Sequence, residues 1–99
     1  MFDEQIEAKG PLIKWSGDKA SWFFVVLSGD VVGEIHYAAM GRTGGFGSVK
    51  VRVTIGVTTW ETSLFPHKAV AGFVLPVKAA VRKAEGLAEG DIVSLALRI

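Results

Sequence analysis

The feature that most constrains the fold is a strict alternation of apolar and polar residues over residues 49–55. Because successive side chains of a strand point to opposite faces, this pattern predicts a strand with one buried and one solvated face. Gly56-Val57-Thr58 indicates a turn, after which residues 59–65 return as the second strand of a hairpin. The sequence therefore predicts an antiparallel sheet with one face on the core.

Short apolar segments predict further strands along the rest of the chain. Residues 22–27 are a dense aromatic and β-branched run, typical of a strand that is buried on both faces. Gly10-Pro11 separates an opening strand from a short second one, and Pro66-His67-Lys68 ends the returning strand of the hairpin. The expected strands cover residues 2–8, 12–15, 22–27, 49–55, 59–65, 73–75 and 92–97.

Two short helices are expected between these strands. Ser28-Gly29-Asp30 offers an N-cap for a helix over residues 31–40. Pro76 stands at the first position of a second helix, where proline is tolerated, and Gly86 ends that helix. Because strands and helices do not alternate, the order favours a small antiparallel β-barrel over a doubly wound sheet. The expected apolar faces are Val31, Ile35 and Ala39 in the first helix and Val77, Ala80, Val81 and Ala84 in the second.

Composition narrows the class of protein further. Apolar residues make up 49% of the chain and the formal net charge is +1, which excludes intrinsic disorder and predicts no general attraction to nucleic acid or membranes. The chain has no cysteine and two histidines, so we expect no disulfide, no metal site and no cofactor. The acidic start of the chain and the absence of a long apolar run predict a cytoplasmic protein, with residues 1–99 as a single domain.

Two stretches of the sequence resemble a known family. The first is VRVTIG at residues 51–56 with WETSLFP at residues 60–66, and the second is FVLPVKAAVRKA at residues 73–84 with GDIV at residues 90–93. They resemble an uncharacterised prokaryotic family of small barrel domains, a domain of unknown function found alone or fused to a bacteriocin-protection-type domain. The resemblance implies a mainly β fold, a small double-split β-barrel or pseudobarrel of about six or seven short strands with one or two short helices. It implies no activity.

The second stretch alone is similar to the AbrB/MazE-type swapped-hairpin domains of transition-state regulators and antitoxins. Those domains share a proline step into a short basic helix, a glycine-leucine pair, and glycine-aspartate before a strand. They are much shorter than this chain and build one barrel from two chains, whereas 99 residues are enough to close a barrel alone. The likeness makes a DNA-binding regulator the alternative function.

Positive charge is concentrated in the middle of the chain. Residues 42–83 carry a net charge of +6, whereas both flanking segments are negative. Lys78 and Arg82 are four residues apart and are expected on one helical face, where like charges repel each other mildly. Two interpretations stay open: a bound anion offsets the repulsion, or both side chains are solvated and Arg82 pairs with Glu85.

The candidate ligand site joins these cations to the predicted hairpin. Trp60 is expected either in the core or at a mouth of the barrel, and barrel mouths often hold ligands. Cations of the strand over 49–55 converge on the site if its polar face adjoins the second helix. The candidate site consists of Arg52, Trp60, Ser63, Lys78 and Arg82.

Evidence for catalysis is weak in the sequence. Ser63 and His67 suggest a nucleophile and a base, but no orienting acid is evident and no Gly-x-Ser-x-Gly elbow surrounds the serine. His36 has no second metal ligand nearby. We therefore expect no catalytic residues and no enzymatic activity.

These observations predict a non-enzymatic barrel that binds an anionic or small polar ligand through a basic face. The protein is expected to be a monomer or a weak dimer without a membrane partner. A DNA-binding regulator, which is less favoured, and a protein-interaction module are the alternatives.

Overall fold

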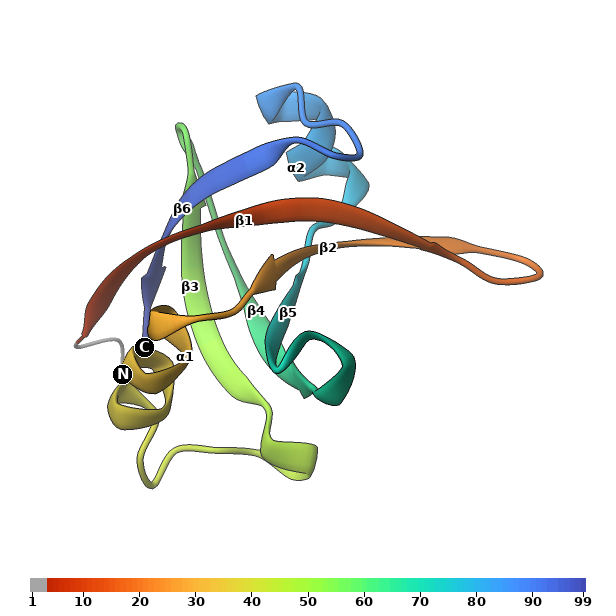
Figure 1. The fold of residues 1–99 in the computed structure, drawn as a ribbon. Helices are drawn as coiled ribbons and strands as arrows, with labels where there is room; N and C mark the ends of the chain where they lie inside the picture. The colour runs from red at the N-terminus through yellow and green to blue at the C-terminus, as the bar shows by residue number, and fades with distance from the viewer. Residues whose placement is uncertain (1–3) are drawn as a thin grey trace.

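The computed structural model describes residues 4–99 and shows a closed barrel of antiparallel strands (Figure 1). Around the barrel the strands follow the order β1-β2-β5-β4-β3-β6, and β6 pairs with β1. This architecture confirms the predicted mainly β, double-split barrel. Phe2 and Asp3, expected in the opening strand, lie outside the described residues. The strands are β1 (Gln5–Ser16), β2 (Ser21–Leu27), β3 (Val49–Ile55), β4 (Thr58–His67), β5 (Gly72–Pro76) and β6 (Ile92–Arg98).

Two α-helices lie at opposite ends of the barrel (Figure 1). The first, α1 (Asp30–Ala38), connects β2 to β3, close to the predicted range. The second, α2 (Ala79–Glu85), connects β5 to β6 and ends at Gly86 in the left-handed conformation, as predicted. Two 3₁₀ turns, η1 (Gly45–Gly47) and η2 (Lys68–Val70), complete the connections.

The prediction that Pro76 opens the second helix is wrong. Pro76 is the last residue of β5 and pairs with Phe24 of β2, so the extended conformation continues through it. The helix begins at Ala79. The helical face expected from the spacing is consequently only half right, because Val77 and Val81 are buried but Ala80 and Ala84 are exposed.

Two strands, β1 and β4, each take part in two sheets. β1 pairs with β6 over residues 5–11 and with β2 over residues 12–16. β4 pairs with β3 over residues 58–64 and with β5 over residues 65–67. The predicted strand break at Gly10-Pro11 is therefore wrong, because β1 continues and only its partner changes. The predicted end of the returning strand at Pro66-His67-Lys68 is confirmed, since β4 ends at His67. Neighbouring strands part at two places, β1 from β2 and β4 from β5.

A proline marks each of these partings. Main-chain groups of a strand point alternately to its two neighbours. Leu12 donates its N–H to Asp91 before β6, at 2.8 Å, so the preceding Pro11 faces β2 and has no N–H to donate there. Val77 donates its N–H to Phe23 of β2, at 2.9 Å, so the preceding Pro76 faces β4. The missing donors end the β1–β2 and β4–β5 ladders.

The core fills the inside of the barrel. The alternation over β3 is confirmed, since its four apolar side chains are buried. The expectation for β2 is wrong in part: Val25 and Leu27 are buried, but Trp22 is 53% exposed. Trp22 belongs to the half of β2 that has left β5, so only β1 pairs with it.

Candidate functional site

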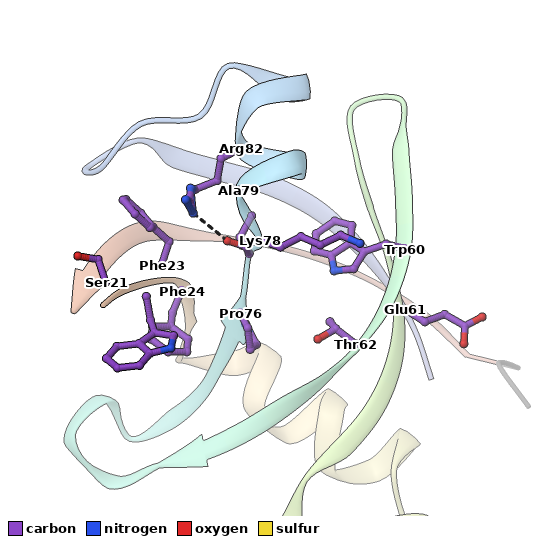
Figure 2. A pocket seen from close by; sticks show the side chains of 12 residues that line it. Ser21, Phe23, Phe24, Trp60, Glu61, Thr62, Pro76, Lys78, Ala79 and Arg82 are labelled. Carbon is purple, nitrogen blue, oxygen red and sulfur yellow. Dashed lines mark hydrogen bonds between the residues drawn. The ribbon is translucent and has the colours of Figure 1, made fainter. Parts of the chain in front are cut away.

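A pocket of about 410 Å³ lies where β4 parts from β5 (Figure 2). One wall comes from β2, the opposite wall from β4, and the floor from the connection between β5 and α2. Aromatic rings line two sides and two cations come from the α2 side. The lining residues are Ser21, Trp22, Phe23, Phe24, Trp60, Glu61, Thr62, Pro76, Val77, Lys78, Ala79 and Arg82.

Arg82 is held in a fixed position at the pocket. Its guanidinium carbon lies 3.7 Å from the centre of the Phe23 ring, within the range of a cation–π interaction. Its Nη1 donates a hydrogen bond to the carbonyl oxygen of Val77, at 3.2 Å (Figure 2). The side chain is half-buried. A bidentate anion therefore meets a guanidinium that has already lost most of its rotational freedom.

Lys78 supplies the second, more mobile charge. It is the N-cap residue of α2, and its carbonyl oxygen accepts the N–H of Arg82 at 3.1 Å. Figure 2 shows its side chain directed toward Trp60. Lys78 is exposed, and no ion pair to it is present among residues 4–99. The pocket is thus lined by two cations, with the Arg82 guanidinium at the Phe23 wall and the Lys78 side chain directed toward the Trp60 wall (Figure 2).

Trp60 lies both against the core and at the mouth of the pocket. Its ring packs against the core cluster and also lines the pocket. Its partner in the β3–β4 register is the buried Val53, which places Trp60 on the inner face of β4. Trp60, Lys78 and Arg82 of the candidate site are therefore brought together.

Arg52 does not join this site. It alternates with buried Val51 and Val53 and so lies on the outer face of β3, where its Nη2 contacts Glu61 Oε2 at 2.8 Å. Figure 2 shows the Glu61 carboxylate pointing away from the other lining side chains. The hydrogen bond from Arg52 lowers the pKa of Glu61, and the charges of Arg52 and Lys50 lower it further. Cations of β3 thus do not converge on those of α2.

Ser63 is also outside the group of lining side chains. It stands opposite Lys50 in the β3–β4 register, an odd number of residues from Trp60, so its side chain lies on the other face. His67 lies four residues further along the same strand, about 13 Å away at the rise of a strand. His67 Nδ1 instead accepts the N–H of Ala69, at 3.2 Å. Ser63 and His67 therefore do not form a nucleophile–base pair.

Glu85 does not pair with Arg82. Its Oε2 accepts a hydrogen bond from the Thr58 hydroxyl at 2.6 Å and one from the Val57 N–H at 3.3 Å. The carboxylate thereby ties the end of α2 to the tip of the β3–β4 hairpin. This link holds the α2 side of the pocket against its β4 side.

Phe23, Phe24 and Trp22 were missed as site residues. An apolar run such as residues 22–27 is typical of a buried strand and predicts core residues. Pro76 was a usable signal for the β4 side of the pocket only, since it faces β4 and has no N–H to continue that pairing, whereas Val77 still bonds to Phe23. Thr62 lines the pocket without any distinguishing sequence pattern.

The two histidines and Phe73 line a different pocket, of about 360 Å³. The His36 ring lies 5.2 Å from the Phe73 ring and the His67 ring 4.9 Å from that of Trp15. Among residues 4–99 no group of three or more histidine, aspartate or glutamate side chains is arranged to hold a metal ion.

Comparison with known proteins matches the chain to one family model. The model is described as a domain of unknown function (DUF1905), and it matches residues 9–97. No curated protein matches the chain. Within residues 4–99, neither α-helix has the length and apolar character needed to span a bilayer.

Proposed function

The chain belongs to the DUF1905 family, whose function is unknown, and we propose that this member is a non-enzymatic binding protein. Its ligand carries an anionic group on a flat apolar body and enters the pocket between β2, β4 and α2. The observation that carries the proposal is the meeting of Lys78, Arg82, Trp60 and Phe23 around one opening. The sequence predicted an anionic or small polar ligand, and the proposal now specifies an anion that carries a flat apolar group.

Charge supports an anionic ligand. Lys78 and Arg82 both line the pocket, one toward each of its aromatic walls. The acid that lines the pocket, Glu61, is engaged with Arg52 on the outer face. A bound anion meets guanidinium N–H groups of Arg82 that the Val77 carbonyl does not use.

Shape and the aromatic lining support an apolar body on that anion. A volume of about 410 Å³ is within the range of small-molecule sites, roughly 300–1,000 Å³. Trp60 and Phe23 offer flat apolar surfaces from opposite walls. A free inorganic anion leaves these surfaces in water, so an aromatic anion gains additional binding energy from their burial.

The DNA-binding alternative receives less support. It needs a continuous basic surface, and the cations of β3 lie on the outer face while Lys78 and Arg82 border the pocket. Arg52 also pairs with an acid.

Titration with phenyl phosphate tests the proposed function, followed by ¹H–¹⁵N spectra that include the tryptophan indole signals. We expect the Trp60 indole and the amides of residues 77–82 to shift, and Lys78→Gln to weaken binding about fivefold, the size of one partly exposed charge interaction. Lys83→Gln is the matched control: it makes the same charge change on the same helix, outside the pocket.

Benzyl alcohol and inorganic phosphate separate the two parts of the ligand. Each is expected to bind more weakly than phenyl phosphate. Equal effects of Lys78→Gln and Lys83→Gln, or shifts scattered over other strands, contradict the proposal.

A further inference from the structure

The pocket is bordered by strand edges rather than by one strand face. Its lining includes three runs of consecutive residues, 21–24, 60–62 and 76–79. Successive side chains of a strand point to opposite faces, so three neighbours in a row contribute only where the main chain itself is accessible. The pocket is therefore a groove between the edges of β2 and β4.

The alternation of hydrogen bonds tells which main-chain groups of β4 face this groove. Ile55 and Thr58 flank a two-residue turn and so form a hydrogen-bonded pair. Even-numbered residues of β4 consequently bond to β3, while the N–H and C=O groups of Thr59, Glu61 and Ser63 point the other way. The same parity directs Phe65 toward β5, with which it does pair.

No strand of the described chain covers this edge between Thr59 and Ser63. β5 pairs with β4 only over residues 65–67. Continuing the register places Pro76 opposite Ser63, and the proline has no N–H to donate to the Ser63 carbonyl. Edge strands with free donors and acceptors are templates for a further strand. Ser63, predicted as a site residue for its side chain, thus borders the groove with its main chain.

We propose that an extended acidic peptide binds in the groove and adds to the edge of β4 as a further strand. This inference rests on the proposed function, since it names the class of ligand that occupies the same site. Main-chain hydrogen bonds to Glu61 and Ser63 hold the peptide, as in other domains that bind peptides by strand addition. Residues 59–63 offer a length of about 17 Å, enough for roughly five peptide residues.

Charge complementarity selects an acidic peptide. Lys78 and Arg82 border the groove on the α2 side and attract carboxylates of the added strand. Trp60 and Phe23 line the same groove and offer apolar surface to the peptide. A second copy of this chain fits the groove less well, because pairing two β4 edges antiparallel brings the two Lys78 side chains into the same groove.

Peptides with methylated amides test the role of the main chain. The probe is an acetylated and amidated pentapeptide, Val-Asp-Phe-Asp-Val, with binding followed by calorimetry. Two derivatives carry N-methyl groups on alternate amides, one set on each edge of the peptide. Both keep the charge and the side chains, so only the derivative methylated on the pairing edge is expected to bind more weakly, by about tenfold or more.

Two substitutions of Ser63 test the protein side. Ser63→Pro removes the N–H that faces the groove and leaves the β3 ladder intact, a position where an edge strand tolerates proline. Ser63→Ala keeps the N–H and removes only the hydroxyl. We expect Ser63→Pro to weaken peptide binding about tenfold and Ser63→Ala to leave it unchanged, with ¹H–¹⁵N spectra confirming that both variants keep the fold.

Amide hydrogen exchange provides a measurement on the unmodified protein. The amides of Glu61 and Ser63 are expected to exchange fast in the free protein and to slow at least tenfold with saturating peptide. Phenyl phosphate is expected to leave both fast, because it offers no main-chain carbonyl.

The outcomes separate this inference from the proposed function. If phenyl phosphate binds at Lys78 but both methylated peptides bind equally well, strand addition is wrong and the proposed function stands. If neither phenyl phosphate nor the peptide binds, both fail. Slow exchange at Glu61 and Ser63 only as protein concentration rises identifies a second copy in the groove and overturns the peptide.

Discussion

At both places where neighbouring strands separate, a proline without an N–H ends the pairing, but the side chains around the two openings differ. β1 leaves β2 at Pro11, and β4 leaves β5 at Pro76. The opening beside β1 is lined by Glu7, Ala8, Lys9, Ser28, Val31 and Ser94, with one acid, one base and no aromatic ring. The opening beside β4 carries two cations without an inward acid, and four aromatic rings.

The helices explain part of this difference. α1 starts three residues after β2 ends, so Val31 in its first turn packs against the core and lines the opening beside β1. α2 places Arg82 at the other opening, where its guanidinium covers the Phe23 ring. The opening beside β1 is thus packed by α1 as part of the core, whereas the opening beside β4 has the charges and aromatic rings of a binding site.

The largest expected effect tests whether the two places where strands separate contribute equally to the stability of the fold. Leu12 and Leu64 are fully buried and each adjoins the point where its strand changes partners. Replacing either by alanine removes the same buried volume, so Leu12→Ala and Leu64→Ala are each expected to cost about 3–5 kcal/mol of unfolding free energy. Urea denaturation measures both, and a difference above about 2 kcal/mol shows that the two places are not equivalent.

Gly10 provides a test of the place where β1 leaves β2. A Cβ atom on Gly10 overlaps the carbonyl oxygen of Val26, where β1 crosses β2 closely. Gly10→Ala is expected to destabilise the fold by about 3 kcal/mol and to leave the affinity for phenyl phosphate unchanged. Gly33→Ala is the control, because Gly33 has open space around it and an alanine within α1 stabilises by up to about 1 kcal/mol. Weaker ligand binding in folded Gly10→Ala indicates that the two openings are coupled.

Arg82 provides the corresponding test of the β4 opening. Arg82→Met keeps an apolar stem but loses the contact with Phe23 and the hydrogen bond to Val77. We expect a loss of about 1–2 kcal/mol in thermal or urea unfolding, together with weaker binding of phenyl phosphate. Lys83→Met, one residue along α2 and outside the pocket, is expected to change stability by less than about 0.5 kcal/mol. Equal effects of the two substitutions contradict the structural role given to Arg82.

The smallest expected effect concerns the acid at the rim of the β4 opening. The hydrogen bond from Arg52 lowers the pKa of Glu61 in the folded state. A carboxyl of this kind stabilises the fold above its unfolded pKa, and the contribution is lost as the pH falls through the lower folded value. Carbon-detected NMR titration is expected to give Glu61 a pKa below its ordinary value, and Arg52→Met to return it toward that value. An unchanged Glu61 titration in Arg52→Met shows that the ion pair does not form in solution.

Local pattern was sufficient for much of this fold. The alternation over residues 49–55 predicted β3 and its inward face, and the Gly56 turn predicted the hairpin with β4. The left-handed end of α2 at Gly86 was predicted for the same reason, since only nearby residues decide a turn or a helix cap. The conformation of a turn, a helix end or a strand face is thus determined by residues close together in the sequence.

The candidate site was predicted only in part. The alternation of side chains between the two faces of a strand explains which of its residues are absent from the pocket. Trp60 and Ser63 are three residues apart on β4, so their side chains lie on opposite faces. Arg52 faces outward because Val51 and Val53 face inward. These consequences were available from the alternation itself, whereas the meeting of Lys78 and Arg82 with Trp60 depends on which strands become neighbours.

The order of residues alone predicted the positions of most strands, the hairpin turn at Gly56 and the basic segment, although it wrongly divided β1 at Gly10-Pro11. Only long-range contacts decide that β1 and β4 bend across two sheets, that Pro76 closes a strand instead of opening a helix, and that Phe23 lines a groove as well as packing against the core. A proline ends pairing on one edge only, so its effect depends on which neighbour stands at that edge. That neighbour is set by contacts far apart in the chain.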